Sequence, residues 1–315
     1  MSIVERAVDM FGAVPQPALK AAPASEAPLP PSKADLIERA VARKDAPAPD
    51  SVDASRAPDL APADRPVAAA PSRNVCIDRE RLKHQRMLVP DGDRTPITES
   101  FRRIKRHVLA NLASPRAGTN LVMITSSLPG EGKTFCAINL AISLAMEMDR
   151  TVLLVDADVA KPSVTSALGI KVNGELGLMD VLLDPAIPLS DVICRTDIGT
   201  LSVLPAGTRH SRATEVLASR AMRELMQETA ERYPDRVIIF DSPPLLAASE
   251  ASALATRMGQ IVLVVEAGRT TESTLKEALA RIESANVVGA LLNKGTAPGA
   301  SLGGYGYGYG YGYGG

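Results

Sequence analysis

The sequence predicts an α/β fold in which a mainly parallel sheet is covered by helices on both faces. Two observations predict it. Between residues 120 and 293, short apolar runs alternate with segments of helical periodicity. These runs are apolar at successive positions, which is typical of strands that are buried on both faces. We expect the strands at 121–125, 152–155, 201–204, 237–240, 261–265 and 287–292.

Segments of different composition flank this region. Residues 1–75 are rich in alanine and hold 12 of the 24 prolines, which is typical of a disordered arm. Two similar pieces within it, 3–8 and 36–41, are either docking helices for a partner or a chance similarity. Residues 295–315 are rich in glycine and tyrosine and are expected to form a flexible tail. The domain itself is therefore expected at 76–294.

Charge and cysteine content narrow the classes of function. Acidic and basic residues balance, 36 against 35, so net charge indicates no polyanionic partner such as nucleic acid. Cys76, Cys136 and Cys194 lie far apart, which indicates reduced thiols and argues against a zinc or iron–sulfur site. No apolar run approaches the ~20 residues that span a bilayer. We expect a cytoplasmic protein that only a partner could hold at a membrane.

A helix is predicted at 95–112, directly before the first long strand. Thr95 can cap it, and Pro96 suits its first position. Apolar residues recur at helical spacing, at Phe101, Ile104, Val108 and Leu112. The charged residues are expected to lie off this stripe and to be solvated, at Glu99, Arg102, Lys105 and Arg106.

The strand at 121–125 leads through a glycine-containing turn into a helix at 133–148. The turn runs from Ser127 to Thr134 and nearly matches G-x-x-x-x-G-K-[ST], with serine in place of the first glycine. Backbone N–H groups of such a loop bind phosphates, Lys133 would reach the β- and γ-phosphates, and Thr134 would bind Mg²⁺. The alternative is a glycine-rich turn that caps an ordinary helix. The turn predicts a P-loop NTPase whose nucleotide contacts come from Ser127, Pro129, Gly130, Glu131, Gly132, Lys133, Thr134 and Phe135.

Acidic residues follow two of the predicted strands. Asp156 and Asp158 come after the strand at 152–155, and Asp241 follows the strand at 237–240. Ligands bind at the carboxyl ends of parallel strands, so these acids are expected beside the phosphate loop. Because Mg²⁺ takes few protein carboxylates together with phosphate oxygens, the sequence predicts a nucleotide–Mg²⁺ site. Its predicted metal ligands are Thr134, Asp156, Asp158 and Asp241.

The remaining helices are expected at 214–232, 249–257 and 271–285, with shorter ones between 163 and 194. Asn293 follows the last strand and is a candidate contact for the nucleotide base. An asparagine at a strand end is equally often a turn residue.

The tail carries five of the six tyrosines, at Tyr305, Tyr307, Tyr309, Tyr311 and Tyr313. One interpretation is an adhesive segment that stacks on nucleic acid or on itself, although the tail has no Arg or Lys to hold phosphates. The other is a cluster of phosphate acceptors, each phosphate adding roughly −1.5 to −2 charges. The chain from Asn293 to Tyr313 could span up to ~70 Å, enough to reach another subunit.

Together, the phosphate loop, Asp156-x-Asp158, Asp241-Ser-Pro-Pro and the tyrosine cluster resemble the bacterial tyrosine kinases (BY-kinases) of capsule and exopolysaccharide systems. More narrowly, they are similar to stand-alone tyrosine autokinases found beside exosortase systems. The resemblance covers roughly 76–315. It implies an ATP- and Mg²⁺-dependent kinase that phosphorylates its own tyrosine cluster in trans and thereby regulates exopolysaccharide polymerisation or export.

The resemblance also implies roles for single residues. Lys133, Asp156 and Asp158 would be catalytic, with Asp156 helping to take the tyrosine proton and Asp158 organising Mg²⁺. Asp241 matches the Walker B acid that binds the metal. Where many members have arginine after the first acids, this chain has Ala160, with Lys161 next to it.

The helix at 95–112 carries a further match. Glu99, Arg102 and Lys105 fall on the family's E-x-x-R-x-x-R subunit-contact motif, which implies a ring-shaped homo-oligomer. Lys105 replaces the last arginine and loses its bidentate geometry. The resemblance further implies a separate transmembrane chain-length regulator that activates the kinase and holds it peripherally at the inner membrane, and a phosphotyrosine phosphatase.

Two rival classes remain. A cycling ATPase of the partition and division-site type shares the sheet and the acids but carries Lys-Gly-Gly-x-Gly-Lys-Thr, and here Leu128 and Pro129 occupy the Lys-Gly positions. A scaffold with an inactive nucleotide site is the other. ATP turnover would distinguish the scaffold from both enzymes, and phosphate on the tail would distinguish the kinase from the cycling ATPase.

Overall fold

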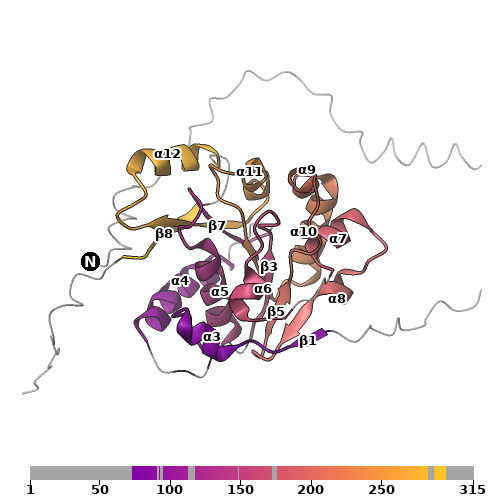
Figure 1. The fold of residues 1–315 in the computed structure, drawn as a ribbon, viewed down its shortest axis with the longest axis horizontal. Coiled ribbons are helices and arrows are strands. Elements are labelled where there is room, and N and C mark those ends of the chain that lie inside the picture. Colours follow the sequence, from indigo (N-terminus) through magenta and orange to yellow (C-terminus); the bar gives the residue numbers. More distant parts are fainter. Residues whose placement is uncertain are drawn as a thin grey trace, which may run out of the picture. The chain divides into compact units, whose positions relative to one another are not determined.

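The computed structural model describes residues 73–90, 92, 95–112, 118–147, 149–171, 176–282 and 287–295 (Figure 1). The repeated arm pieces at 3–8 and 36–41 lie outside these residues, as does the whole tyrosine cluster from Tyr305 to Tyr313. The first strand, β1, spans Arg73–Val75 and takes in the last three residues of the segment expected as an arm.

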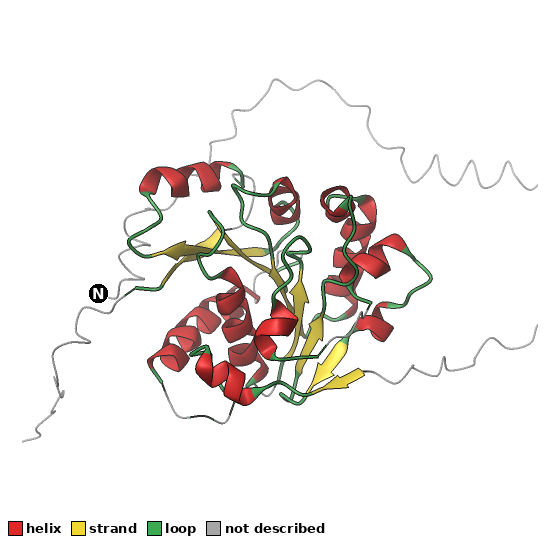
Figure 2. Cartoon of the chain, viewed as in Figure 1, coloured by secondary structure: helices red, strands yellow, loops and turns green. Residues whose placement is uncertain are grey.

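The described residues form an eight-stranded sheet with the order β1-β4-β5-β3-β6-β2-β7-β8 (Figure 2). The strands after β1 are β2 Leu121–Ser126, β3 Thr151–Asp156, β4 Cys194–Thr196, β5 Leu201–Leu204, β6 Arg236–Asp241, β7 Gln260–Glu266 and β8 Val287–Asn293. The strands from β5 to β8 in this order run parallel, whereas β4 pairs antiparallel with β5. The prediction of a mainly parallel sheet is confirmed, although two three-residue strands were not predicted, the edge strand β1 and its neighbour β4.

Helices cover both faces of this sheet. One face packs against α3 Arg79–His84, α4 Pro96–Leu112, α5 Lys133–Ala145 and α6 Val164–Leu168. The other packs against α7 Leu178–Leu183, α8 Leu189–Val192, α9 Ala213–Leu217, α10 Arg220–Arg232, α11 Ser249–Ala255 and α12 Glu272–Ala280. The two-sided covering expected from the apolar strands is therefore confirmed.

The central strand β3 shows why these strands are apolar throughout. Val152 and Leu154 point into the core beneath α5, whereas Leu153 and Val155 point into the core beneath α7 and α10. Successive side chains of a strand point to opposite faces, and here both faces are buried. The carboxyl end of β3 therefore emerges from a closely packed sheet, which fixes the position of the acids that follow it.

The predicted helix at 214–232 is wrong, because the chain forms two helices there. α9 ends at Leu217, and α10 begins after Ser219, whose side chain accepts a hydrogen bond from the Met222 N–H at 3.3 Å. A serine cap starts a new helix by satisfying a free N–H group. The helices predicted at 133–148 and 271–285 end earlier, at Ala145 and Ala280.

Helix α4 begins as predicted, since Thr95 Oγ1 accepts a hydrogen bond from the Thr98 N–H at 3.3 Å. Its residues Phe101 and Val108 are buried. The Phe101 ring meets the Phe135 ring edge-on, with 6.4 Å between centroids. Because Phe135 lies in the first turn of α5, α4 packs directly behind the helix that follows the phosphate loop.

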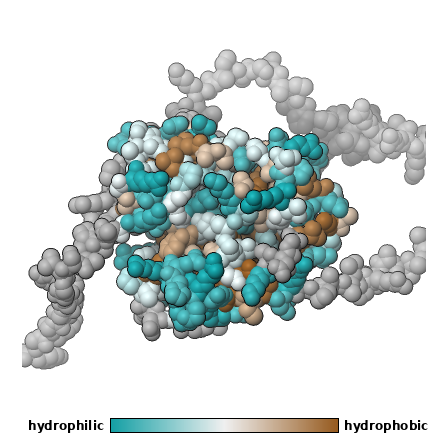
Figure 3. All heavy atoms as spheres, viewed as in Figure 1, coloured by the Kyte–Doolittle hydropathy of each residue, from teal (hydrophilic) through white to brown (hydrophobic). Residues whose placement is uncertain are grey.

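None of the described helices combines the length and the apolar character needed to cross a bilayer. Figure 3 shows a mainly hydrophilic face with apolar side chains in small groups. The large apolar side chains that are exposed within the described part of the chain are Met146, Leu176, Leu183 and Leu292.

Candidate functional site

The turn between β2 and α5 has the form of a phosphate-binding loop. Gly130 and Gly132 have φ values of 87° and 98°, in the left-handed region that favours glycine. Gly132 is the N-cap of α5 and makes no side-chain capping bond, so the first N–H groups of α5 have no side-chain cap. Free N–H groups at a helix N-terminus bind anions. The loop therefore fits a phosphate chain, as predicted.

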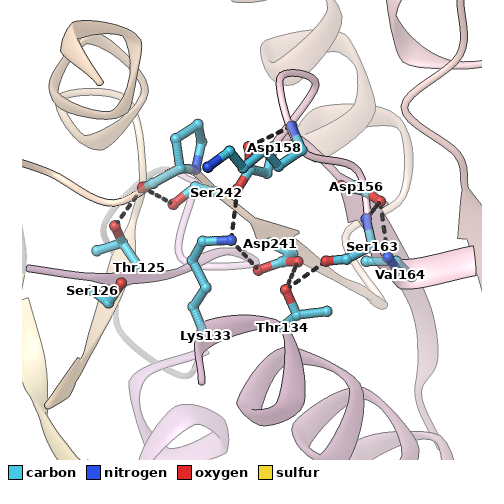
Figure 4. A network of polar contacts seen from close by, with 12 residues as sticks. Thr125, Ser126, Lys133, Thr134, Asp156, Asp158, Ser163, Val164, Asp241 and Ser242 are labelled. Atoms are coloured by element: carbon cyan, nitrogen blue, oxygen red, sulfur yellow. Dashed lines mark hydrogen bonds and ion pairs between the residues drawn. The ribbon is translucent and has the colours of Figure 1, made fainter. Parts of the chain in front are cut away.

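The predicted charged residues meet at this loop (Figure 4). The Lys133 ammonium lies 2.6 Å from Asp158 Oδ2 and 4.0 Å from Asp241 Oδ1. The Thr134 hydroxyl donates a hydrogen bond to Asp241 Oδ2 at 2.6 Å. Three segments far apart in the sequence thus bring one cation, one hydroxyl and two carboxylates together.

Asp156 occupies the position beside Asp241 on the neighbouring strand, since the two residues are register partners in β3 and β6. Its Oδ2 accepts hydrogen bonds from the N–H groups of Ser163 and Val164 at 2.9 and 3.0 Å. Within the described part of the chain, Asp156 Oδ1 and Asp241 Oδ1 are buried and have no hydrogen-bond partner. Buried polar atoms usually have partners, so these two oxygens are available to a ligand.

Burial and mutual repulsion shift the titration of these acids. Burial, with the charge of Asp241 adding to it, raises the pKa of Asp156 to about 7. Burial also raises the pKa of Asp241 to about 6, against the opposing charge of Lys133. Burial alone would lower the pKa of Lys133, but the charges of Asp241 and Asp158 hold it above its usual value. Protons thus compete with any cation for the two aspartates near neutral pH.

The oxygen ligands at this site fit a Mg²⁺ ion that is bound partly by the protein and partly by phosphate oxygens. Over the residues that the structure describes, no three His, Cys, Asp or Glu side chains are grouped so that they could hold a metal ion alone. Thr134 and Asp241 would contact the ion, and the open oxygen of Asp156 would bind one of its waters. This agrees with the preference of Mg²⁺ for few protein ligands, several waters and phosphate oxygens. Asp158 is instead paired with Lys133.

Two predicted nucleotide contacts hold the loop itself. Glu131 is buried, and its Oε2 accepts a hydrogen bond from the Leu128 N–H at 2.8 Å while its Oε1 accepts one from the Thr270 hydroxyl. Asn293 Nδ2 donates to the Glu131 carbonyl at 2.9 Å. Both side chains therefore support the loop from the side of β7 and β8.

The other predicted nucleotide contacts differ in their surroundings. The Phe135 ring packs against the Phe101 ring of α4. Ser127 is buried, and its hydroxyl has no hydrogen-bond partner among the described residues. Pro129 is exposed at the outer edge of the loop.

The charged residues predicted on α4 divide into two kinds. Glu99 and Arg102 are exposed and form an ion pair at 2.9 Å. The expectation that Lys105 lies off the buried stripe is wrong, because Lys105 is only 9% exposed. Its ammonium donates to the Ser143 carbonyl at 3.1 Å and pairs with Glu147. A long aliphatic side chain can cover apolar surface while its charged end finds a partner.

Ser163 is a site residue that sequence reasoning missed. Its hydroxyl lies 2.9 Å from the Thr134 hydroxyl, and its N–H donates to Asp156. It therefore connects the phosphate-loop threonine with the first acid. The available signal was a serine just before a short apolar helical segment, which by itself indicates only a helix cap.

Comparisons with known proteins show the family of the chain. The family model described as an AAA domain matches residues 119–288. The tyrosine-protein kinase YwqD of Bacillus subtilis is 35% identical over 199 residues, which are 62% of this chain and 80% of YwqD. The succinoglycan biosynthesis transport protein ExoP of Rhizobium meliloti is 34% identical over 213 residues, 66% of this chain and 26% of ExoP. The chain thus spans most of YwqD but about a quarter of ExoP.

A solved structure of a tyrosine kinase domain is also similar to this chain. The kinase domain of the Escherichia coli tyrosine kinase ETK superposes with a TM-score of 0.59 and 28% sequence identity, covering 74% of this chain and 94% of that domain. Three findings indicate the same family: the phosphate loop, the acids at the ends of β3 and β6, and the similarity over most of YwqD. The chain belongs to the bacterial tyrosine-protein kinase family, whose nucleotide-binding domain is of the AAA type.

Proposed function

We propose that this chain transfers the γ-phosphate of ATP to Tyr305, Tyr307, Tyr309, Tyr311 and Tyr313 of a neighbouring copy of itself. The observation that carries the proposal is the meeting of Lys133, Thr134 and Asp241 at the phosphate loop, with buried carboxylate oxygens left open beside them. Phosphoryl transfer depends on positioning and charge neutralisation, and this site offers both.

Lys133 binds and orients the phosphates. In the described site its ammonium neutralises Asp158, and a bound triphosphate would compete for the same ammonium. The charge of Asp158 would then be free to face the acceptor and the ion. Thr134 and Asp241 would hold a bound Mg²⁺ ion, and this ion would neutralise phosphate charge.

Asp156 is the residue that accepts the tyrosine proton. A free tyrosine has a pKa of ~10, so an ordinary aspartate is a weak base toward it. The raised pKa of Asp156, about 7, makes this carboxylate a stronger base. The hydrogen bonds from Ser163 and Val164 fix its Oδ2 and leave Oδ1 for the acceptor or a bridging water.

The neighbouring copy is proposed from two features. The chain from Asn293 to Tyr313 could span up to ~70 Å, enough to reach another subunit. Glu99 and Arg102 are exposed on α4 and offer charged groups to a second subunit, in a ring. Each added phosphate brings roughly −1.5 to −2 charges, so phosphorylated tails would repel each other and loosen the ring.

The cellular role is proposed from the relatives. ExoP is by its name a protein of succinoglycan biosynthesis and transport. We propose that this chain regulates polymerisation or export of an exopolysaccharide, at the inner membrane, through a separate transmembrane chain-length regulator. A phosphotyrosine phosphatase would reset the cycle.

The test is incubation of the purified chain with ATP and Mg²⁺, followed by mass spectrometry of the C-terminal peptide. The expected result is phosphate on the five tyrosines in the wild type and none in Lys133→Met. Hydrolysis of ATP with unmodified tyrosines would contradict the proposal and favour the cycling ATPase. Absence of both activities, also with the membrane activator present, would favour the scaffold.

Transfer between copies needs a mixing experiment. An active chain in which all five tail tyrosines are replaced by phenylalanine is mixed with the Lys133→Met chain. The first has no acceptor and the second has no activity, so phosphate on the tail of the second shows transfer in trans. A wild-type rate that is independent of protein concentration, with no transfer in the mixture, would show transfer within one chain.

A further inference from the structure

The end of β8 lies against the phosphate loop, and the acceptor tail leaves the domain from the same place. Lys294 Nζ donates a hydrogen bond to the Gly130 carbonyl at 2.7 Å. Asn293 Nδ2 donates to the Glu131 carbonyl at 2.9 Å. Two donors at the root of the tail thus hold two successive carbonyl groups of the loop, and the chain continues through Gly295 into the tyrosine tail.

The contact is close. A Cβ atom on Gly132 would lie 2.1 Å from Asn293 Nδ2, so the loop and Asn293 fit only because this position is glycine. Lys294 has a φ of 58°, in the left-handed region that a lysine rarely adopts. Backbone conformations of this kind persist where surrounding contacts hold them, and they concentrate at functional sites.

The same contacts extend to the connection between β7 and α12. Lys294 Nζ lies 3.2 Å from Glu266 Oε1, and Glu266 also pairs with Arg269 at 3.1 Å. The Glu131 side chain reaches the Thr270 hydroxyl. These residues form one network, which we call the tail-root clamp: Glu131, Glu266, Thr270, Asn293 and Lys294.

A phosphate loop binds anions only while its N–H groups point inward. Groups that hold the loop's carbonyls on the outer side therefore fix the direction of the N–H groups. Lys294 and Asn293 hold the carbonyls of Gly130 and Glu131 in this way. The Glu131 side chain supports the start of the loop differently, by accepting a hydrogen bond from the Leu128 N–H. Lys294, Asn293 and Glu131 are therefore positioning residues, because they act through the loop.

We propose that the tail-root clamp sets how long the phosphate loop retains its nucleotide. Lys294 and Asn293 hold the loop in its anion-binding form, so loss of the Lys294 contact with Gly130 loosens the loop around ADP. This positioning of the loop does not rest on the proposed transfer to the tail.

The positioning is tested by stopped-flow release of a fluorescent ADP analogue from the full chain. Lys294→Met should release it roughly three- to tenfold faster, because a charge-assisted hydrogen bond to the loop is lost. Lys294→Arg should restore part of the retention. Lys276→Met is the matched control, since Lys276 lies on α12, pairs with Glu272 at 2.6 Å and should leave release unchanged. Release from a correctly folded Lys294→Met chain at the wild-type rate would overturn the proposal.

Discussion

Buried carboxylates on the two sides of the phosphate loop differ in how their oxygens are used. Glu131 is 1% exposed, and both of its oxygens accept hydrogen bonds, from the Leu128 N–H and the Thr270 hydroxyl. Asp156 and Asp241 are 0% exposed, and in the described part of the chain each keeps one oxygen without a hydrogen-bond partner, although Asp241 Oδ1 lies 4.0 Å from the Lys133 ammonium. A buried acid with every bond made stabilises the fold, whereas one with an open oxygen costs stability and is available to a ligand.

Replacement of Asp241 should have the largest effect and is the strongest test of this comparison. Asp241→Asn should lower tail phosphorylation roughly 100-fold or more, because a metal-binding charge is lost where transition-state charge is neutralised. Without nucleotide, its melting temperature should equal or exceed that of the wild type, since the raised pKa of Asp241 indicates that burial costs its charge more than Lys133 and Thr134 compensate. Phosphorylation is measured by mass spectrometry and melting by calorimetry. A variant that retains activity would remove Asp241 from the metal site.

Glu131 should show the opposite pattern in stability. Glu131→Ala leaves the Leu128 N–H and the Thr270 hydroxyl without partners and should cost roughly 2–3 kcal/mol of unfolding free energy. Urea denaturation measures this. The control is Glu231→Ala on α10, where an exposed contact with Gln227 at 2.9 Å is lost and the cost should stay below about 0.5 kcal/mol. Equal costs for the two variants would contradict a structural role for Glu131.

The pH dependence of stability sharpens the contrast further. Asp156 has a folded-state pKa of about 7, above its unfolded value of 3.8, so between these values the folded state binds the extra proton. Stability from this group is therefore greatest at low pH and is lost as pH rises toward 7. From pH 5.5 to pH 8, the ligand-free wild type should lose roughly 2 kcal/mol relative to Asp156→Asn. Parallel stability curves for the two proteins would show that Asp156 is ionised throughout.

The smallest effects should distinguish Lys105 from Arg102, two of the basic residues on α4. Lys105→Met breaks the contacts with Ser143 and Glu147 and should cost about 1–2 kcal/mol. Arg102→Met removes an exposed ion pair with Glu99 and should change stability by less than about 0.5 kcal/mol. If Arg102 contacts a second subunit, Arg102→Met should still shift the oligomer to lower mass in light scattering. A larger stability loss in Arg102→Met than in Lys105→Met would contradict these assignments.

The site's main groups could be predicted from sequence because parallel-sheet geometry gathers them. Asp156 ends β3 and Asp241 ends β6, and adjacent parallel strands end at one edge. Lys133 and Thr134 follow β2 at the same edge, which pairs with β6. Local pattern and sheet order together were sufficient for these residues, and for the layers of the fold.

The remaining features depend on contacts between segments far apart in the sequence. Lys105 is buried against Ser143 and Glu147. These partners lie 38 and 42 residues away along the chain, so helical spacing cannot show the contact. The second partner of the Glu131 carboxylate, Thr270, lies 139 residues later in the chain. The helix predicted at 214–232 failed for a local reason, since Ser219 was not recognised as a cap.

The central claim is that the open carboxylate oxygens hold the Mg²⁺–nucleotide complex. Its most direct test is the affinity for ADP, measured by titration calorimetry with and without Mg²⁺, in the wild type, Asp241→Asn and Glu131→Gln. The account predicts that Mg²⁺ strengthens ADP binding in the wild type and in Glu131→Gln, and has no effect in Asp241→Asn. An effect of Mg²⁺ that persists in Asp241→Asn, or that Glu131→Gln abolishes as fully, would contradict the account.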